Sequence, residues 1–493
     1  MHKKDVIQFI AKKFGFVRTL IPVFLLTFFV VILLLSQTSQ AAILKVGQGK
    51  PYSTIQSAIN AAKAGDSVLV LKGTYRENID FLGKAISVRS VSGPQKTVID
   101  GEGSDSVVTF KSSEGLRSVL NGFTITNGTG TPRNYYTVGG GIYLLESSPS
   151  ITNCIIKGNT AAEGAGIWCE NSSPFITNCA ISENVVTFWE GSGGGIYCYH
   201  SSPTITNCII SGNITLNDEG SGGGISCFDS SPTITNCVIR NNVAHDTAGI
   251  IISGDSSPTI ADCLISNNIA SGLGGGILLY FVDPPVSITN CTISNNFASE
   301  GGGGIICKGV QISLDNCIIK GNATHHIGGG VMSDYGDITI TNCNITNNYA
   351  YNNGGGVYVD TTLSIVNSTI SGNESMANGG ALYCDFDSSV NVVNSIIWGN
   401  NAMGGYEEMY IDYWVTYWET FNISYSDIRG GWQGTGNIDA DPLFVGNGDY
   451  HLTAGSPCID TGTGEGAPLD DIDGDIRPQG NGYDMGADEY VPE

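Results

Sequence analysis

Four aspartates surround a glycine in the segment DDIDGD, residues 470–475, near the end of the sequence. Closely spaced carboxylates interrupted by a glycine provide the oxygen ligands that calcium prefers. We therefore predict Asp471, Asp473 and Asp475 as a metal-ligating set, with calcium as the candidate ion. The EF-hand frame is absent, so a solvated acidic turn that pairs with Arg477 remains the alternative.

No other residues form a recognisable catalytic set in the sequence. The basic residues of the central region are few, and no carboxylate cluster stands out beside them; they are Lys157, Arg240, Lys308 and Lys320. The histidines share no spacing with the cysteines, and the GxSxG elbow of a serine nucleophile is missing. We therefore predict no catalytic residue and no cofactor, calcium excepted.

The elements that position these charged residues are indicated by a repeated sequence pattern. Its anchor is the cysteine of ITNC, or the serine that replaces it, and successive anchors lie 25 to 29 residues apart. That period is typical of solenoids, in which each repeat stacks on its neighbours. The anchors are Cys154, Cys179, Cys208, Cys237, Cys263, Cys291, Cys317, Cys343, Ser368 and Ser395.

Isoleucine stands two residues after every anchor, from Ile156 to Ile397, and an apolar residue stands three residues before each anchor. The position between anchor and isoleucine varies freely, as an outward side chain does. This alternation predicts a strand with one buried face. The anchor then points inward, where cysteine acts as a small hydrophobic residue.

Asparagine stands five residues after every anchor, from Asn159 to Asn400, and directly before nine of the ten. Asparagine tolerates left-handed backbone and bonds nearby backbone groups, so both positions predict tight turns. On successive coils the stacked amides are expected to bond one another in a ladder. With glycine runs and Ser-Ser-Pro at the other corners, each repeat is predicted to form three short strands of a parallel β-helix, an all-β fold.

The alternation of GGGIYC and ITNCxISxN resembles the right-handed parallel β-helix superfamily, the pectate-lyase-like proteins. It is also similar to the GGAI and FxxN repeats of chlamydial polymorphic outer membrane proteins. The resemblance implies a right-handed coil but no single activity, since this scaffold hosts lyases, hydrolases, adhesins and non-enzymes. The Gly-His-Gly of its glycosidases is missing. GTYRE at residues 73–77 is similar to a pectin methylesterase segment, but that family's catalytic segments have no counterpart downstream, so we interpret it as architecture.

The composition divides the chain into four parts. Residues 1–41 combine a basic start, an apolar run and small residues at the end, which predicts a cleaved secretory signal rather than an uncleaved anchor. Residues 43–121 are expected to hold a helix cap, built on the amphipathic stretch 55–62, and the first coils. Residues 122–401 are the repeats, and residues 402–493 are an aromatic closure followed by an acidic tail.

Charge and cysteine content narrow the function classes. The net charge of −24 opposes binding of nucleic acid, and of anionic polymers by simple attraction. Fourteen cysteines in an exported chain permit disulfides, but most fall in stacked columns with a spacing of about 4.8 Å, beyond the usual Cβ separation of a bridge. We therefore expect free, buried thiols.

Together these patterns predict an exported, non-catalytic scaffold, secreted or at the cell surface, that binds polysaccharide or another surface along its flank. The runner-up is a calcium-dependent polysaccharide lyase with one of the lysines as base, and a weaker third option is metal handling in the periplasm. The regular repeat favours the scaffold, because enzymes of this fold usually break the repeat where loops build the cleft.

The most irregular turns are where a site is expected. They are residues 188–193 and 213–222, and they add Trp189, Asp218 and Glu219. No membrane span is expected after signal cleavage, and the oligomeric state stays open.

Overall fold

The computed structural model describes residues 41–215, 219–385, 388–411 and 421–492. The chain divides into two compact units, residues 1–43 and 44–493. The predicted signal peptide lies almost wholly outside the described residues, and so does Asp218. Within the described ranges, no helix is both long and apolar enough to span a membrane.

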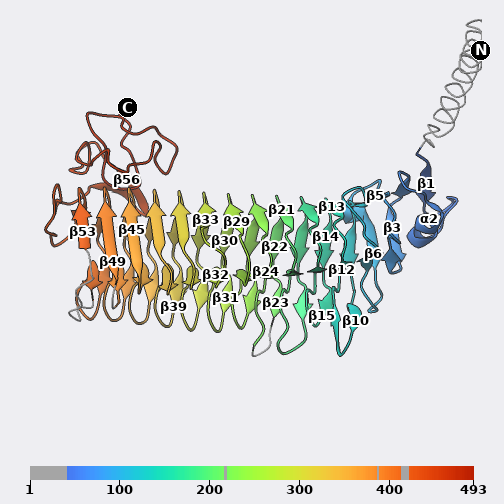
Figure 1. Cartoon of the computed structure of the whole chain (residues 1–493). Helices are drawn as coiled ribbons and strands as arrows, with labels where there is room; N and C mark the ends of the chain where they lie inside the picture. Colours follow the sequence, from blue (N-terminus) through green and yellow to red (C-terminus); the bar gives the residue numbers. More distant parts are fainter. Residues whose placement is uncertain (1–40, 216–218, 386–387, 412–420, 493) are drawn as a thin grey trace, which may run out of the picture. The chain divides into compact units, whose positions relative to one another are not determined.

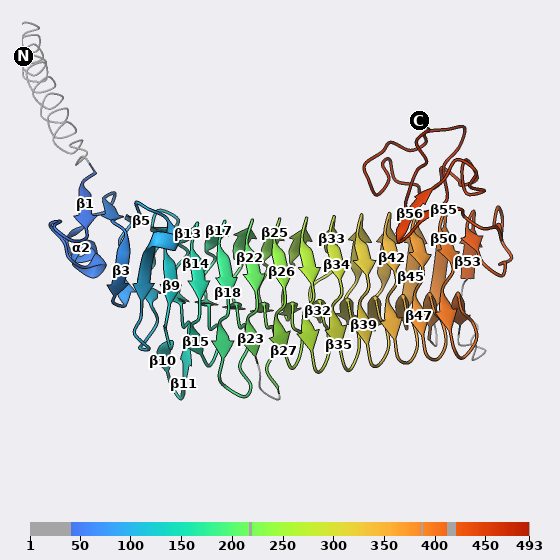
Figure 2. The same ribbon diagram turned by 180° about the vertical axis from the view of Figure 1, so that it is seen from behind.

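The described residues up to 432 in the second unit fold into a parallel β-helix in which a regular coil adds one strand to each of several parallel sheets (Figures 1 and 2). We number the sheets by their order within a coil. Sheets 1, 2, 3 and 4 have 13, 15, 14 and 10 strands. One representative coil contributes β20 (Ile196–Tyr199), β21 (Thr204–Thr206), β22 (Ile209–Ser211) and β23 (Ile214–Thr215) to sheets 1 to 4.

Three strands per repeat were expected, and the fourth sheet corrects that number. Its strands follow the asparagine that stands five residues after the anchor, and each has only two residues, as β23 does. A two-residue strand shows no alternation of buried and exposed positions, so the periodicity of the sequence contains no signal for it.

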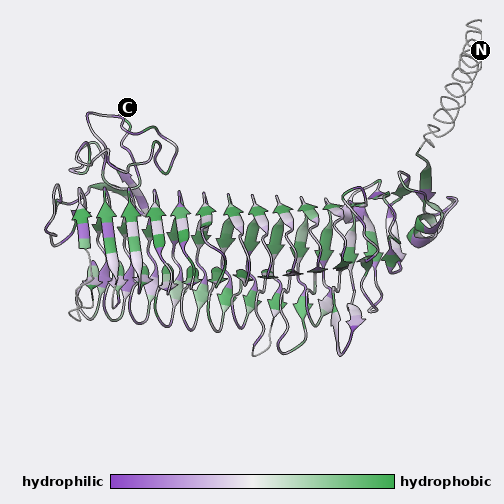
Figure 3. Cartoon of the chain, in the orientation of Figure 1, coloured by the Kyte–Doolittle hydropathy of each residue, from purple (hydrophilic) through white to green (hydrophobic). Residues whose placement is uncertain are grey.

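Equivalent residues of successive coils stack in register. Ile210 pairs with Ile239, and Ile239 pairs with Ile265, and all three side chains are fully buried. Apolar residues therefore recur at the same place from coil to coil (Figure 3). The prediction of continuous inward columns of isoleucine is confirmed.

The predicted asparagine ladder runs inside the turn between sheets 3 and 4. Asn213 Nδ2 donates to Asn242 Oδ1 at 3.1 Å and to the carbonyl of Ile181 at 3.0 Å, and the same contacts repeat along the column. The left-handed backbone lies elsewhere, at residues such as Asn207 (φ 54°) directly before the anchor and Gly212 (φ 64°) directly before the ladder residue. The two asparagine positions therefore have separate roles: one bonds between coils, and the other permits a turn.

All fourteen cysteines are free and buried, as expected. Cys208 Sγ donates to the carbonyl of Thr206 at 3.3 Å within its own coil. Ser368 makes the same type of contact, since its Oγ donates to the carbonyl of Val366 at 2.9 Å. A hydroxyl and a thiol can therefore exchange at the anchor position.

At the N-terminal end, strand β1 (Ile43–Val46) precedes helix α2 (Ile55–Ala61), which forms within the predicted amphipathic stretch and buries Ile55, Ala58 and Ile59. Glu77, the glutamate of GTYRE, accepts hydrogen bonds from the backbone N–H groups of Ile55 at 2.7 Å and Gln56 at 2.9 Å. These are among the first N–H groups of a helix, which have no partner within the helix itself. Glu77 therefore has an architectural role.

At the other end, Phe421 and Trp432 pack against the main core, while Tyr413, Trp414, Tyr417 and Trp418 lie outside the described residues. The following segment, residues 433–492, lies beside the last coils (Figure 1). Asn394 Nδ2 donates to the carbonyl of Thr463 at 2.6 Å, and the N–H of Ala487 donates to Thr369 Oγ1 at 3.1 Å. The acidic tail is thus attached to the flank of the coils.

Candidate functional site

The outer face of sheet 1 carries a column of aromatic side chains in its N-terminal coils. Tyr143, Trp168 and Tyr197 are register partners on β12 (Ile142–Leu145), β16 (Ile167–Glu170) and β20. The rings of Tyr143 and Trp168 stack in parallel, with centroids 5.1 Å apart and an interplanar angle of 2°. Parallel strands hold equivalent positions about 4.8 Å apart, which suits stacked rings.

Two insertions stand beside this aromatic column. The first is an antiparallel hairpin formed by β10 (Thr131–Arg133) and β11 (Tyr136–Val138). The second is the irregular turn 188–193, whose Phe188 ring stacks on Tyr136 with centroids 6.0 Å apart. The turn was singled out in the sequence. The hairpin was missed, although the residues inserted before the first glycine run were its signal.

A pocket of about 280 Å³ lies between the hairpin and the aromatic column. Its lining includes the floor residues Trp168 and Tyr197, the hairpin residue Tyr136, and Tyr199 at the rim. Tyr199 is 37% exposed, whereas Trp168 is only 2% exposed. We call this site the walled pocket.

One cation and two carboxylates line the walled pocket. Arg133 forms an ion pair with Glu170, in which Nη2 donates to Oε1 at 2.9 Å, and its guanidinium carbon lies 4.8 Å from the centre of the Trp168 ring. The hydrogen bond with Glu170 raises the pKa of Arg133. Burial raises the pKa of Glu163, so this carboxyl holds its proton more tightly than a solvated glutamic acid.

A second aromatic column occupies the same face of sheet 1 in the C-terminal coils. Tyr358 and Tyr383 stack with centroids 5.4 Å apart, and Tyr383 and Tyr410 with centroids 5.0 Å apart. The Tyr358 hydroxyl is hydrogen-bonded to Asp385. The hairpin and the turn 188–193 belong to the N-terminal coils, so neither of them lies beside this second column.

The basic residues singled out in the sequence lie at different places. Lys157, Arg240 and Lys320 are exposed on sheet 3. Lys308 lies on sheet 1, where its Nζ is 3.1 Å from Asp334 Oδ2. Asp334 interacts with Asp360, and Asp385 is hydrogen-bonded to Tyr358. Burial and the neighbouring Asp334 raise the pKa of Asp360 to about 6.

The three predicted calcium ligands have different surroundings. Asp471 is buried, and its Oδ1 accepts hydrogen bonds from the N–H groups of Asp473 at 2.9 Å and Asp475 at 2.8 Å. Asp473 Oδ2 contacts His451 Nε2 at 2.7 Å, and Asp475 is exposed. Asp471 thus holds the acidic turn in shape, and the calcium set itself stays a prediction.

Arg477 does not pair with the acidic turn. Its Nη1 donates to Glu489 Oε2 at 2.9 Å, and both side chains are fully buried. Its Nη2 donates to the carbonyl of Ala487 at 2.8 Å. The guanidinium therefore joins separate stretches of the tail.

Comparison with known proteins agrees with this architecture. The family model for the right-handed β-helix region matches residues 86–216 and 140–312, and the Chlamydia polymorphic membrane protein repeat matches residues 367–385. The fold of this chain is a right-handed parallel β-helix. The superfamily resemblance and the chlamydial repeat expected from the sequence are both confirmed.

Solved structures resemble the β-helix at low sequence identity. Pectate lyase Pel9A aligns with a TM-score of 0.39 at 14% identity over 92% of this chain and 97% of its own. The catalytic domain of a GH87 α-1,3-glucanase aligns with a TM-score of 0.34 at 12% identity over 77% of this chain and 69% of its own. A family 28 exopolygalacturonase of Yersinia enterocolitica aligns with a TM-score of 0.31 at 12% identity over 78% of each chain.

These likenesses carry no argument about activity, because one fold hosts many chemistries. No curated protein matches the sequence significantly.

Proposed function

We propose that the protein is an exported, non-catalytic β-helix scaffold that binds a polysaccharide in the walled pocket. The observation that carries the proposal is the walled pocket itself, in which aromatic side chains of sheet 1 and of the hairpin meet; they are Tyr136, Trp168, Tyr197 and the exposed Tyr199. Sugar rings have apolar C–H faces that pack on aromatic rings, and binding sites combine such surfaces with a few polar groups that fix orientation. Arg133, Glu163 and Glu170 supply the polar groups.

The charges favour a neutral polysaccharide. The chain has a net charge of −24, and the one arginine of the walled pocket is already paired with Glu170. An anionic polymer would meet repulsion from the surface without gaining a free cation in the pocket. Stacking and hydrogen bonds to hydroxyl groups are then the main contributions to binding.

Export is supported by the basic and apolar character of residues 1–41 and by the match to a repeat of polymorphic membrane proteins. Cleavage is expected after Ala41. Mass spectrometry of the protein collected outside the producing cells should find a chain that begins at Ala42, and retention of the full chain inside the cells would contradict export.

Two matched tyrosines test the pocket. Tyr199 and Tyr280 are both the last residues of sheet 1 strands, β20 and β32 (Ile277–Tyr280), and they are 37% and 44% exposed. Only Tyr199 lines the walled pocket. Tyr199→Ala should lower affinity for a neutral polysaccharide about 2- to 10-fold in calorimetry, whereas Tyr280→Ala should leave it unchanged. Equal loss in both variants, or no binding of any neutral or anionic polysaccharide, would contradict the proposal.

A lyase remains the second candidate because Lys308 pairs with Asp334, which in turn neighbours Asp360. A lysine base beside carboxylates that hold calcium is the arrangement such a reaction needs. Incubation with polygalacturonate and calcium tests it through the ultraviolet absorbance of unsaturated product. Product that is lost in Lys308→Ala would replace the scaffold proposal by the lyase.

A further inference from the structure

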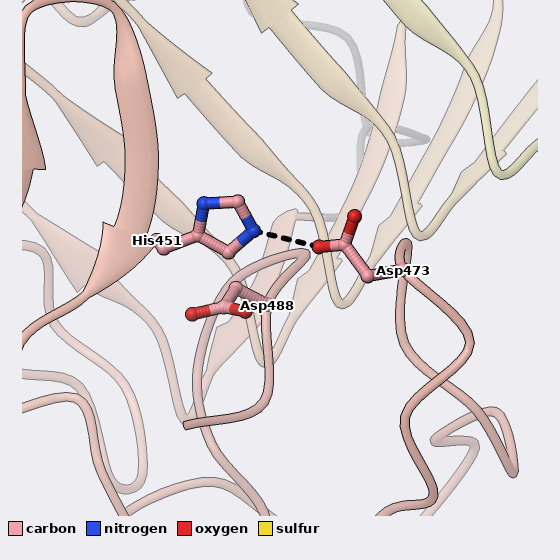
Figure 4. A group of neighbouring side chains, drawn as sticks. All are labelled: His451, Asp473 and Asp488. Carbon is pink, nitrogen blue, oxygen red and sulfur yellow. Dashed lines mark hydrogen bonds and ion pairs between the residues drawn. The ribbon is translucent and has the colours of Figure 1, made fainter. Parts of the chain in front are cut away.

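Three side chains with metal-ligating atoms converge in the tail (Figure 4). His451 lies on β56 (Asp449–Leu452), Asp473 on the acidic turn, and Asp488 close to the end of the chain. Their ligand atoms all lie within 4.8 Å of one another, and His451 Nε2 is 2.7 Å from Asp473 Oδ2. Among the described residues, this is the one such group of three.

The other nitrogen of His451 has its own partner. Nδ1 is hydrogen-bonded to the carboxylate of Asp449, and because an ionised carboxylate only accepts, the ring donates there. In the neutral imidazole, Nε2 then presents a lone pair to the carboxylate of Asp473. Two such acceptors are stable at this separation with a proton between them, and a metal ion that displaces the proton would take Nε2 and the carboxylate as ligands. Histidines that bind metals usually donate their second N–H to a carboxylate in this way.

Backbone contacts hold both carboxylates in place. The N–H of Asp473 donates to the buried carboxylate of Asp471 at 2.9 Å, and the N–H of Leu452, next to His451, donates to Asp488 Oδ2 at 2.8 Å. Asp488 is only 8% exposed, and a buried carboxylate is costly without a nearby cation. The buried Arg477 is already paired with Glu489.

From these contacts we propose that the tail binds one divalent transition-metal ion through His451 Nε2, Asp473 and Asp488, with water in the remaining positions. One imidazole and two carboxylates suit zinc, manganese or ferrous iron better than calcium, which takes oxygen ligands. The ion ties together β56, the acidic turn and the last residues of the described chain. Its role is to stabilise the fold of the tail itself.

Metal binding is tested on the full mature chain after treatment with a chelator. Calorimetry with zinc, manganese and calcium should show one transition-metal ion per chain, and the ion should slow proteolytic cleavage within residues 433–492. His451→Ala and Asp473→Asn should each weaken binding at least about tenfold, and Asp449→Asn should weaken it less, since Asp449 only orients the ring. Far-ultraviolet circular dichroism confirms that the variants remain folded.

A second histidine–aspartate pair supplies the control. His200 Nδ1 lies 3.9 Å from Asp229 Oδ2 on the outer surface of the coils, so His200→Ala should leave metal affinity unchanged. Absence of transition-metal binding in the wild type would overturn the proposal and leave an imidazolium paired with carboxylates. Calcium binding that survives His451→Ala but is lost in Asp475→Asn would replace it by the calcium set predicted from the sequence. Polysaccharide affinity is measured separately, so either proposal can fail alone.

Discussion

The interior of the coils and the walled pocket are built on the same strands, but their residues are restricted to different degrees. β16 points Ile167 and Cys169 into the core, while Trp168 and Glu170 belong to the pocket. The inward positions stay apolar or small from coil to coil because each packs on the equivalent position of the next coil. The outward residues meet no such restriction, so a site can be placed on the flank while the interior columns stay intact. Interior substitutions should therefore change stability alone, whereas pocket substitutions should also change binding.

The sharpest test of the interior is Asn242→Ala. The amide of Asn242 donates to Ile210 O at 3.1 Å and Asn268 Oδ1 at 3.0 Å, and it accepts from the N–H and the Nδ2 of Asn213. Its loss leaves several fully buried groups without partners and should lower the free energy of unfolding by about 3–5 kcal/mol in denaturant titrations. Asn207→Gly, at an exposed position with φ 54°, should cost less than about 1 kcal/mol. Equal losses of unfolding free energy in the two variants would contradict the stabilising role of the asparagine ladder.

Substitutions in the two aromatic columns of sheet 1 should have similar effects on stability but different effects on polysaccharide binding. Trp168 is 2% exposed and Tyr383 is 8% exposed. Replacing either ring by alanine should lower the free energy of unfolding by about 3 kcal/mol. Only Trp168→Ala should also weaken polysaccharide binding, by about tenfold or more, because only Trp168 lies in the walled pocket. Calorimetry on both folded variants makes the comparison. Comparable binding losses would place the site elsewhere on the sheet.

Glu408 ends the asparagine ladder and should make it sensitive to pH. Asn400 Nδ2 donates to Glu408 Oε2 at 2.6 Å, and burial raises the pKa of Glu408 to about 7. The folded chain then binds this proton more tightly than the unfolded chain, so the contribution of Glu408 to stability is largest at low pH. It should be lost progressively as the pH rises from about 4.5 through 7, by about 1–3 kcal/mol.

Glu408→Gln imitates the protonated side chain and isolates this effect from other carboxyls. The difference in unfolding free energy between the variant and the wild type should move in the variant's favour from pH 5 to pH 8. A difference that stays constant over that range would show that Glu408 is ionised throughout.

The smallest effect is expected at the anchors. Cys208→Ser should change the free energy of unfolding by less than about 1 kcal/mol, because Ser368 already makes the anchor contact with its hydroxyl. A reducing agent should not change the melting temperature, since the fourteen cysteines are free. A large loss in either measurement would show that the thiols contribute more than packing.

The repeating residues predicted the solenoid because they contact their own copies. Ile210 must meet Ile239, and Asn213 must meet Asn242, so the recurrence of one residue at a fixed interval already specifies the stacking. The fourth sheet escaped detection since two-residue strands such as β23 have no periodicity.

Contacts between unlike residues were decided by the tertiary structure alone. Arg133 meets Glu170 across 37 residues, and His451 meets Asp473 across 22, and neither pair belongs to the repeat. Their distances depend on how an inserted hairpin and a tail fold against the coils, and the spacing within the sequence does not encode that. The sequence by itself determined the coil and its interior, because each residue of an interior column contacts the same or a similar residue type in the next coil. Only the folded chain decided which outward side chains form a site.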